Sequence, residues 1–137
     1  MRIRLIAFLL AEAVALAGVA AAQGRAEVEA REVILRQLAA FRAGDYRTAY
    51  SFASREIQGL FDPAAFERMV KGGYPQIARS TDAWVTETNL APNGRLYVGL
   101  RIRGADGLFV QALYEMVWEE SRWRINGVVT RPDSGAI

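Results

Sequence analysis

The spacing of apolar residues changes once along this chain, near residue 83. Before that point apolar residues recur at helical intervals, as Ile34, Leu38 and Phe41 do. After it they recur at every second position, which is typical of strands that bury one face. The pattern predicts an α+β domain in which three N-terminal helices pack on a four-stranded antiparallel sheet.

Start and stop signals set the bounds of the three predicted helices. Aspartate before a helix accepts exposed backbone N–H groups, proline fits the first helical position, and glycine ends a helix. These signals predict helices from about residue 27 to 43, from Asp45 onward, and from Pro63 to Gly73. Tyr74 and Pro75 are then expected to be extended, because the residue before a proline disfavours helix.

The central hairpin of the predicted sheet has a register that its loop fixes. Residues 105–107 read Ala-Asp-Gly, a three-residue loop with glycine at the left-handed position. Closing this loop pairs apolar residues on one face: Ile102 with Val110, Leu100 with Ala112, and Val98 with Tyr114. The last strand is expected to pair Met116 with Ile125 and Trp118 with Trp123. A loose tail is expected at residues 132–137.

The first 22 residues carry the pattern of a secretory signal peptide. Arg2 and Arg4 precede an apolar run from Leu5 to Ala22, and the small residues at its end suit signal peptidase. Cleavage near Ala22 would leave one domain, residues 25–131, in the periplasm or outside the cell. Two alternatives stay open. The run is just long enough to act as an uncleaved membrane anchor, or it could be a buried helix of a cytosolic protein.

Composition narrows the chemistry that the chain can carry out. The absence of cysteine excludes disulfides and thiolate catalysis, and the absence of histidine removes the commonest general base and metal ligand. The formal net charge of +2 is too small and too dispersed to predict a nucleic-acid partner. The carboxylates are scattered, so no metal site and no cofactor are predicted.

Three segments of the chain resemble one bacterial family. They read QLAAFRAGDYRTAYSFAS from Gln37, LFDPAAFERMVKGGYP from Leu60, and YEMVWEESRWRINGV from Tyr114. Together they are similar to domain of unknown function 4864, within the nuclear transport factor 2-like superfamily. The resemblance covers about residues 33–129 and implies helices packed into a curved sheet to form a cone, frequent export, and no assigned activity. Asn126 departs from the aspartate that the family often shows there.

The resemblance implies that a site would lie inside the cone. Tyr50, Tyr74 and Tyr114 are candidates to line a cavity there, because a buried tyrosine needs a partner for its hydroxyl. Glu87 is a weak candidate for a catalytic or ligand-binding carboxylate. Its strand has no clear apolar face, so both orientations of the side chain stay open.

The outer face of the predicted sheet mixes apolar and arginine side chains, which suits a protein interface. The interface candidates on this face are Tyr97, Arg101, Arg103, Leu113 and Val117. Glu115 lies on the same face and is interpreted as a surface charge near the two arginines.

Three functions remain open, because the wider superfamily includes isomerases, dehydratases and cyclases as well as non-catalytic binding domains. The first interpretation is an exported, non-catalytic domain that binds a small apolar ligand or a partner in the cone. The second is an interaction module that forms a homodimer through the outer sheet face. The third is an isomerase- or dehydratase-like enzyme that uses a buried carboxylate, with Glu87 and tyrosines as its set. A membrane contact is expected only through an uncleaved N-terminal segment.

Overall fold

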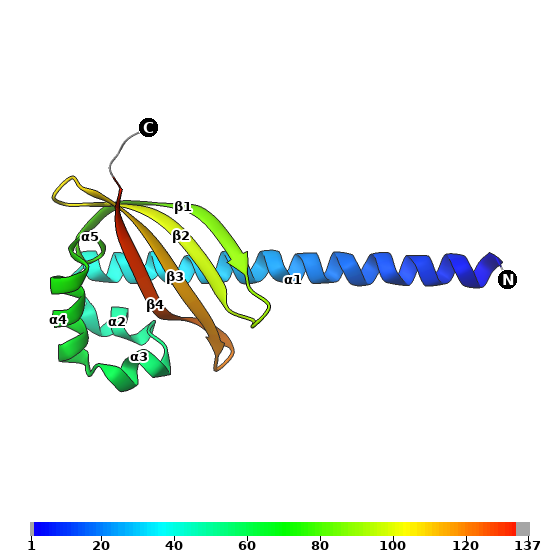
Figure 1. Cartoon of the computed structure of the whole chain (residues 1–137). Helices are drawn as coiled ribbons and strands as arrows, with labels where there is room; N and C mark the ends of the chain where they lie inside the picture. The colour runs from blue at the N-terminus through cyan, green and yellow to red at the C-terminus, as the bar shows by residue number, and fades with distance from the viewer. Residues whose placement is uncertain (1, 134–137) are drawn as a thin grey trace.

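The computed structural model describes the backbone of residues 2–133 and the side chains of residues 17–133. A curved antiparallel sheet lies against a long first helix, and the short helices gather at the C-terminal end of that helix (Figure 1). The strands follow one another in the order β1-β2-β3-β4. The helices are α1 (Arg2–Arg42), α2 (Tyr46–Ser51), α3 (Arg55–Leu60), α4 (Pro63–Gly73) and α5 (Pro75–Ala78), and the strands are β1 (Ser80–Leu90), β2 (Leu96–Gly104), β3 (Phe109–Glu119) and β4 (Arg122–Asp133). The predicted fold class, α+β with helices before an antiparallel sheet, is confirmed.

Two of the predicted helix starts are confirmed by their capping contacts. The Asp45 carboxylate accepts a hydrogen bond from the backbone N–H of Thr48, and the pKa of Asp45 is lowered by its hydrogen bonds to Thr48. The Asp62 carboxylate accepts from the N–H of Ala65, and Pro63 occupies the first turn of α4. Gly44, between α1 and α2, has a φ of +69°. A residue with a side chain would be strained in that conformation, so glycine suits the sharp joint.

The helical half has more breaks than predicted. Ser54 caps a separate helix, α3, by accepting from the N–H of Ile57. The expectation of an extended segment at Tyr74 and Pro75 is wrong, because Pro75 opens the one-turn helix α5. Proline fits the first turn of a helix as well as it fits an extended segment, so the sequence signal was ambiguous there.

The predicted register of the β2–β3 hairpin is confirmed. Ile102 pairs with Val110, Leu100 with Ala112 and Val98 with Tyr114. Gly107 in the loop has a φ of +81°, as the hairpin loop requires. Beyond the hairpin, β4 places Met116 opposite Ile125 and Trp118 opposite Trp123, also as predicted. The strand continues to Asp133, further than the expected end near residue 131, and residues 134–137 lie outside the described part of the chain.

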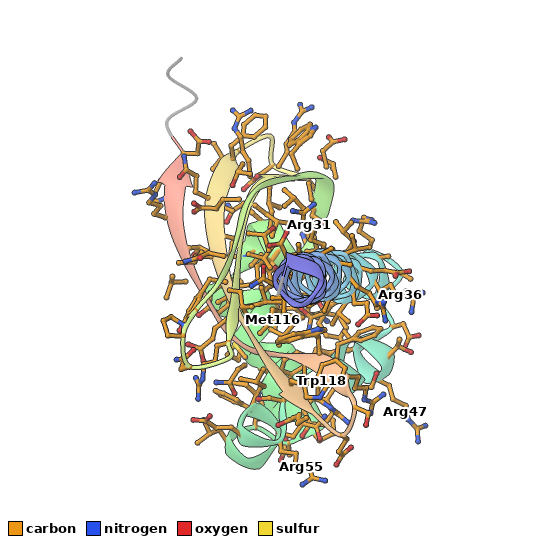
Figure 2. All side chains as sticks on the ribbon, turned by 90° about the vertical axis from the view of Figure 1, so that its right-hand side faces the viewer. Arg31, Arg36, Arg47, Arg55, Met116 and Trp118 are labelled. Atoms are coloured by element: carbon orange, nitrogen blue, oxygen red, sulfur yellow. The ribbon has the colours of Figure 1, made fainter. Side chains whose placement is uncertain are left out.

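The core lies between α1 and the concave face of the sheet. Ala30, Ile34, Leu38 and Phe41 are buried along one stripe of α1. Figure 2 looks along this helix and shows Met116 of β3 close beside it, whereas Arg36, Arg47 and Arg55 point outward. Met116 is fully buried, so the helix covers the middle of the sheet.

The N-terminal part of α1 extends beyond the sheet (Figure 1). Its side chains are exposed from Ala17 to Arg25, and the first buried residue is Ala30. The side chains of residues 1–16, most of the predicted signal peptide, lie outside the described residues. Across the side chains that are described, no helix combines the length and the apolar character needed to cross a membrane.

The free edge of β4 is covered at one point by the segment between α2 and α3. Ala53 forms an isolated parallel bridge with Ile125. The N–H of Ser54 donates to the Ile125 carbonyl at 2.8 Å, and the N–H of Ile125 donates to the Phe52 carbonyl at 2.9 Å. These two bonds dock the short helices against the sheet and close one end of the cone.

Candidate ligand cavity

A cavity of about 220 Å³ lies inside the cone, between the short helices and the concave face of the sheet. We call it the cone cavity. Its walls come from α1, α3, α4, α5, β3 and β4 and the segments between them. The lining residues are Gln37, Phe41, Ala53, Ile57, Phe61, Phe66, Met69, Val70, Tyr74, Ile77, Tyr114, Ile125, Gly127 and Val128. This lining is mostly apolar and aromatic, which is typical of sites for small molecules.

Tyr114 is the most unusual residue of the lining. It is 1% exposed, and its hydroxyl has no hydrogen-bond partner among the described residues. Burial raises the pKa of Tyr114 well above its ordinary value, so the hydroxyl keeps its proton. A buried hydroxyl without a partner costs about 1–3 kcal/mol. Tyr114 therefore combines a place in the cavity lining with a hydroxyl donor that no described residue uses.

Gln37 is a second polar group in the lining, and the sequence did not single it out as a site residue. Its side chain is 4% exposed, and its Nε2 donates to the Ala49 carbonyl at 3.1 Å. No hydrogen bond of its Oε1 occurs within the described residues. Its position in the apolar stripe of Ile34, Leu38 and Phe41 is the signal that could have identified it, because a glutamine on a buried face needs partners.

The three candidate tyrosines have different positions. Tyr74 and Tyr114 line the cavity, and Tyr50 does not. The Tyr74 hydroxyl lies 3.4 Å from the Val128 carbonyl, a long contact. The Tyr50 hydroxyl donates to the Phe61 carbonyl at 2.7 Å, and the Tyr50 ring packs edge-on against Phe66. Tyr50 thus lies behind the wall and holds two lining residues, Phe61 and Phe66, in place.

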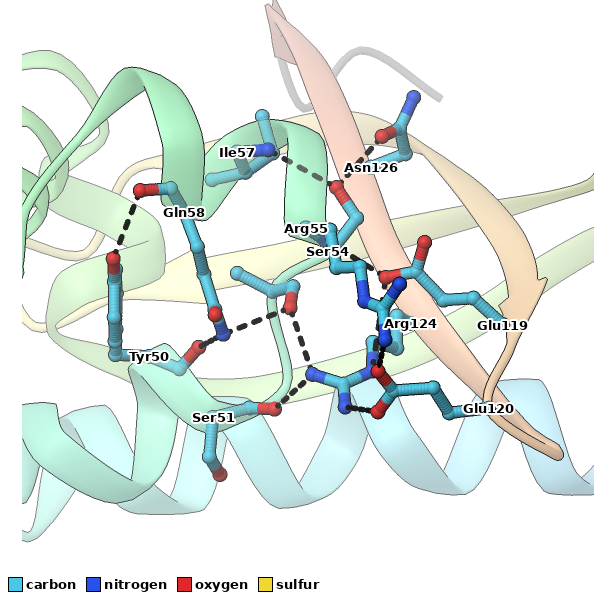
Figure 3. Close-up of polar contacts among 11 residues, drawn as sticks. Tyr50, Ser51, Ser54, Arg55, Ile57, Gln58, Glu119, Glu120, Arg124 and Asn126 are labelled. Atoms are coloured by element: carbon cyan, nitrogen blue, oxygen red, sulfur yellow. Dashed lines mark hydrogen bonds and ion pairs between the residues drawn. The ribbon is translucent and has the colours of Figure 1, made fainter.

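Polar side chains hold α3 and the segment before it in place (Figure 3). Gln58 donates from its Nε2 to the carbonyls of Tyr50 and Ala53 at 3.1 and 3.2 Å. Arg124, which is 6% exposed, donates to the carbonyls of Ser51 and Ala53 and pairs with Glu120 at 3.0 Å. Gln58 thus ties α3 to the segment before it, and Arg124 ties that segment to β4. No residue of α3 is fully buried, although Ile57 packs against the core.

The interpretation of Glu115 as a surface charge near Arg101 and Arg103 is wrong. Glu115 is half-buried and forms an ion pair with Arg95. It also accepts hydrogen bonds from Asn126 at 2.7 Å and from the Tyr97 hydroxyl at 3.1 Å. The Asn126 hydrogen bond is the largest of the contacts that lower the pKa of Glu115.

Asn126 links the Glu115 carboxylate to Ser54, the residue that caps α3 beside the cavity. Its Oδ1 accepts a hydrogen bond from Ser54 Oγ at 2.7 Å, so one amide links Ser54 to Glu115. Asn126 has no partner across the sheet, because Glu115 pairs with Gly127 and Met116 with Ile125. It is the extra residue of a β-bulge, which explains why its side chain can reach toward α3.

Glu87 lies outside the cavity. It pairs with Gly99 across β1 and β2, and its side chain is exposed on the outer face. There it borders a shallow surface pocket together with Gln111, Leu113 and Arg131. The structure therefore separates Glu87 from Tyr50, Tyr74 and Tyr114 and does not bring together the carboxylate and tyrosines of the enzyme interpretation. Within the described residues, no group of three carboxylates could hold a metal ion.

The outer face of the sheet carries the five interface candidates and three further apolar side chains. Phe109 is stacked between neighbours: the Trp84 ring lies 6.2 Å from it, and the Arg101 guanidinium lies 3.9 Å above it. Arg101 also pairs with Asp133 at 2.8 Å, so its charge is partnered. Leu113 and Val129 face each other across β3 and β4 and are 38% and 67% exposed. Tyr97, Arg103 and Val117 lie on the same face, Arg103 exposed and the other two half-buried.

Helices packed on a curved four-stranded sheet, with a cavity between them, make a cone-shaped fold of the nuclear transport factor 2-like type. The chain belongs to the family described as domain of unknown function DUF4864, whose model matches residues 23–136. No curated protein matches the chain. Among solved structures the chain is similar to Aln2 from a Streptomyces species, with a TM-score of 0.52 and 16% identity over 77% of this chain and 88% of that one. At that identity the likeness supports the fold alone.

Proposed function

We propose that this protein is an exported domain that binds a small, largely apolar molecule in the cone cavity. The observation that carries the proposal is a cavity with mostly apolar walls and one buried, unpartnered hydroxyl, that of Tyr114. A volume of about 220 Å³ favours a small ligand, because a dry cavity of about 150 Å³ holds benzene. Export is supported by the N-terminal pattern of basic, apolar and small residues.

Native mass spectrometry tests both parts of this proposal. The full chain is expressed with its own N-terminal segment and recovered from the periplasm. We expect a polypeptide that begins near Gln23, together with a non-covalent extra mass. A chain that keeps its first 22 residues would contradict export, and a clean polypeptide mass under gentle conditions would count against a tightly held ligand.

Replacing Tyr50 with phenylalanine is expected to weaken ligand retention more than folding. The change removes the hydrogen bond to the Phe61 carbonyl, which holds the wall of the cavity, while the ring stays against Phe66. The free energy of unfolding should fall by about 1 kcal/mol, the usual contribution of one hydrogen bond. The affinity for the bound molecule should fall about tenfold, which corresponds to about 1.4 kcal/mol, so a smaller fraction of the protein should carry the bound mass.

Tyr46→Phe is the matched control for this measurement. Tyr46 is also a half-buried tyrosine of α2, but no hydrogen bond of its hydroxyl occurs within the described residues. Removing the Tyr46 hydroxyl should leave ligand retention unchanged. Equal effects of the two substitutions would show that Tyr50 has no special role at the cavity wall.

A second candidate function is homodimerisation through the outer sheet face. It is supported by exposed apolar side chains on that one face: Trp84, Leu113 and Val129. Apolar residues mixed with arginine are typical of interface centres. Dimers of this kind would bury the face and leave the cone cavity free.

Leu113→Glu is expected to convert such a dimer to monomers without unfolding the domain. Leu113 is partly exposed, so a carboxylate there can reach water in a monomer but would be buried in the interface. The measurement is the mass by light scattering at several protein concentrations. Val28→Glu, a similar change at an exposed position of α1, is the control and should leave the mass unaltered. A wild-type monomer at all concentrations would exclude this second function.

A further inference from the structure

We infer that the cone cavity selects a neutral molecule that carries one hydrogen-bond-accepting oxygen, a ketone or an alcohol, over a hydrocarbon or a charged ligand. The inference rests on the proposed function, since it names the ligand class of the same cavity. It goes beyond that proposal because it assigns the polar end of the ligand to particular atoms of Tyr114 and Gln37.

Tyr114 supplies the donor. Its hydroxyl is buried, has no partner among the described residues, and belongs to a residue that lines the cavity. Because burial raises the pKa of this phenol, it stays protonated at neutral pH and can donate to a ligand oxygen. A hydrocarbon would leave the donor unpaired, whereas a carbonyl or hydroxyl oxygen would pair it.

Gln37 supplies an acceptor. Its Nε2 is committed to the Ala49 carbonyl, and this fixes the orientation of the amide, so that its Oε1 is the atom left to a ligand. A ligand hydroxyl can accept from Tyr114 and donate to Gln37, whereas a ketone can only accept. An alcohol should therefore bind at least as tightly as the ketone of the same shape.

The lining disfavours charge. None of its fourteen residues is Asp, Glu, Lys or Arg. A charged ligand would lose its hydration without meeting an opposite charge in this lining, which is costly in an apolar space. Arg124, close to the cavity end at Ala53, already donates to the Ser51 and Ala53 carbonyls and pairs with Glu120.

A matched series of bicyclic probes tests the inference. The probes are indane, 2-indanone, 2-indanol and 2-aminoindane, which share one carbon skeleton and differ in a single group. Calorimetry at pH 7 uses the protein recovered from cells that express the full chain. We expect 2-indanone to bind about tenfold more tightly than indane, the effect of one net hydrogen bond. 2-Indanol should bind at least as well as 2-indanone, and the 2-aminoindane cation should bind most weakly.

Two variants test whether the Tyr114 hydroxyl and the Gln37 amide cause the expected differences in probe affinity. In Tyr114→Phe the advantage of 2-indanone over indane should disappear while indane still binds, because the ring remains in place. In Gln37→Leu the alcohol should lose any advantage over the ketone. Tyr50→Phe alters no lining residue and is expected to weaken both probes alike, so it should keep the ratio of 2-indanone to indane affinity at its wild-type value.

The outcomes separate the inference from the proposed function. Binding of all four probes with equal affinity, or tightest binding of the cation, would overturn the inference and leave a ligand-binding cavity. An unchanged preference in Tyr114→Phe would also overturn it, because the donor would lie elsewhere. Failure of every probe to bind would overturn the proposed function itself.

Discussion

Replacing Tyr114 with alanine is expected to lower the free energy of unfolding by about 3–5 kcal/mol, the range for large aromatic side chains removed from a core. Among the side chains that the structure describes, Tyr114 is the largest that is fully buried. It pairs with Val98 and Val128 on the concave face of the sheet, beside the cone cavity. Urea denaturation followed by circular dichroism measures the loss.

Tyr114→Phe should behave in the opposite way, with a free energy of unfolding equal to or up to about 1 kcal/mol above that of the wild type. It keeps the ring and removes only a hydroxyl that has no partner among the described residues. A loss of more than about 1 kcal/mol in this variant would show that the hydroxyl is hydrogen-bonded in solution. The pair of substitutions thus separates the packing role of the ring from the role of the hydroxyl.

Asn126→Asp is expected to destabilise the domain by about 1–3 kcal/mol at pH 7 to 8 and by much less at acid pH. The Asn126 Nδ2 donates to Glu115 at 2.7 Å, and an aspartate would replace this donor with a second carboxylate. Two facing carboxylates raise the pKa of one of them. The folded variant then binds a proton more tightly than the unfolded chain does. The loss of stability caused by the substitution is therefore largest above the raised pKa, and it shrinks as the pH falls toward the ordinary carboxyl range.

The wild type has the opposite pH dependence at this site. The pKa of Glu115 is lowered, chiefly by the hydrogen bond from Asn126, so the ionised carboxylate stabilises the fold. That contribution is present above the ordinary glutamate pKa and is lost as the pH falls through the lowered value. Denaturation curves of both proteins between pH 4 and 8 should therefore converge at the acid end. Asn93→Asp makes the same change at an exposed loop position, and its free energy of unfolding should differ from the wild-type value by the same amount at every pH. A difference that is constant with pH for Asn126→Asp as well would refute the interaction between residues 115 and 126.

The parts of the fold that follow from local chemistry were predictable from the sequence. Asp45 and Asp62 cap helices because a short side chain can accept the N–H groups just ahead of it. The register of β2 and β3 followed from a three-residue loop and from the requirement that apolar residues share one face. Each of these signals involves residues close together in the chain or a strict period of two.

The wrong interpretation of Glu115 and the open orientation of Glu87 both arise from β-bulges, where side chains no longer alternate between the two faces of the sheet. Thr86 has no partner in β2, since Val85 pairs with Leu100 and Glu87 with Gly99. Asn126 is the corresponding extra residue in β4. A bulged residue belongs to neither face by counting, so the sequence left the orientation of Glu87 open and gave no partner for Glu115.

The division of roles among the tyrosines also could not be read from the sequence. Tyr50, Tyr74 and Tyr114 have similar apolar neighbours, yet Tyr50 bonds to a carbonyl of the α3–α4 connection and Tyr114 bonds to none of the described residues. The difference depends on where α3 ends, and α3 itself was not expected. Its cap, Ser54, directly follows the apolar stripe of α2, so the sequence pattern did not mark a new helix there.

The docking of the segment around Ala53 on β4 has a consequence for how the cavity forms and opens. Each strand pairing joins neighbours in the chain, but Ser54 and Asn126 are 72 residues apart. Closing so long a loop costs more chain entropy than closing a hairpin. The segment can therefore detach while the sheet stays paired, and such local openings are what amide hydrogen exchange detects. A molecule held in the cavity binds only the closed form, so its presence would slow exchange first in residues 52–61.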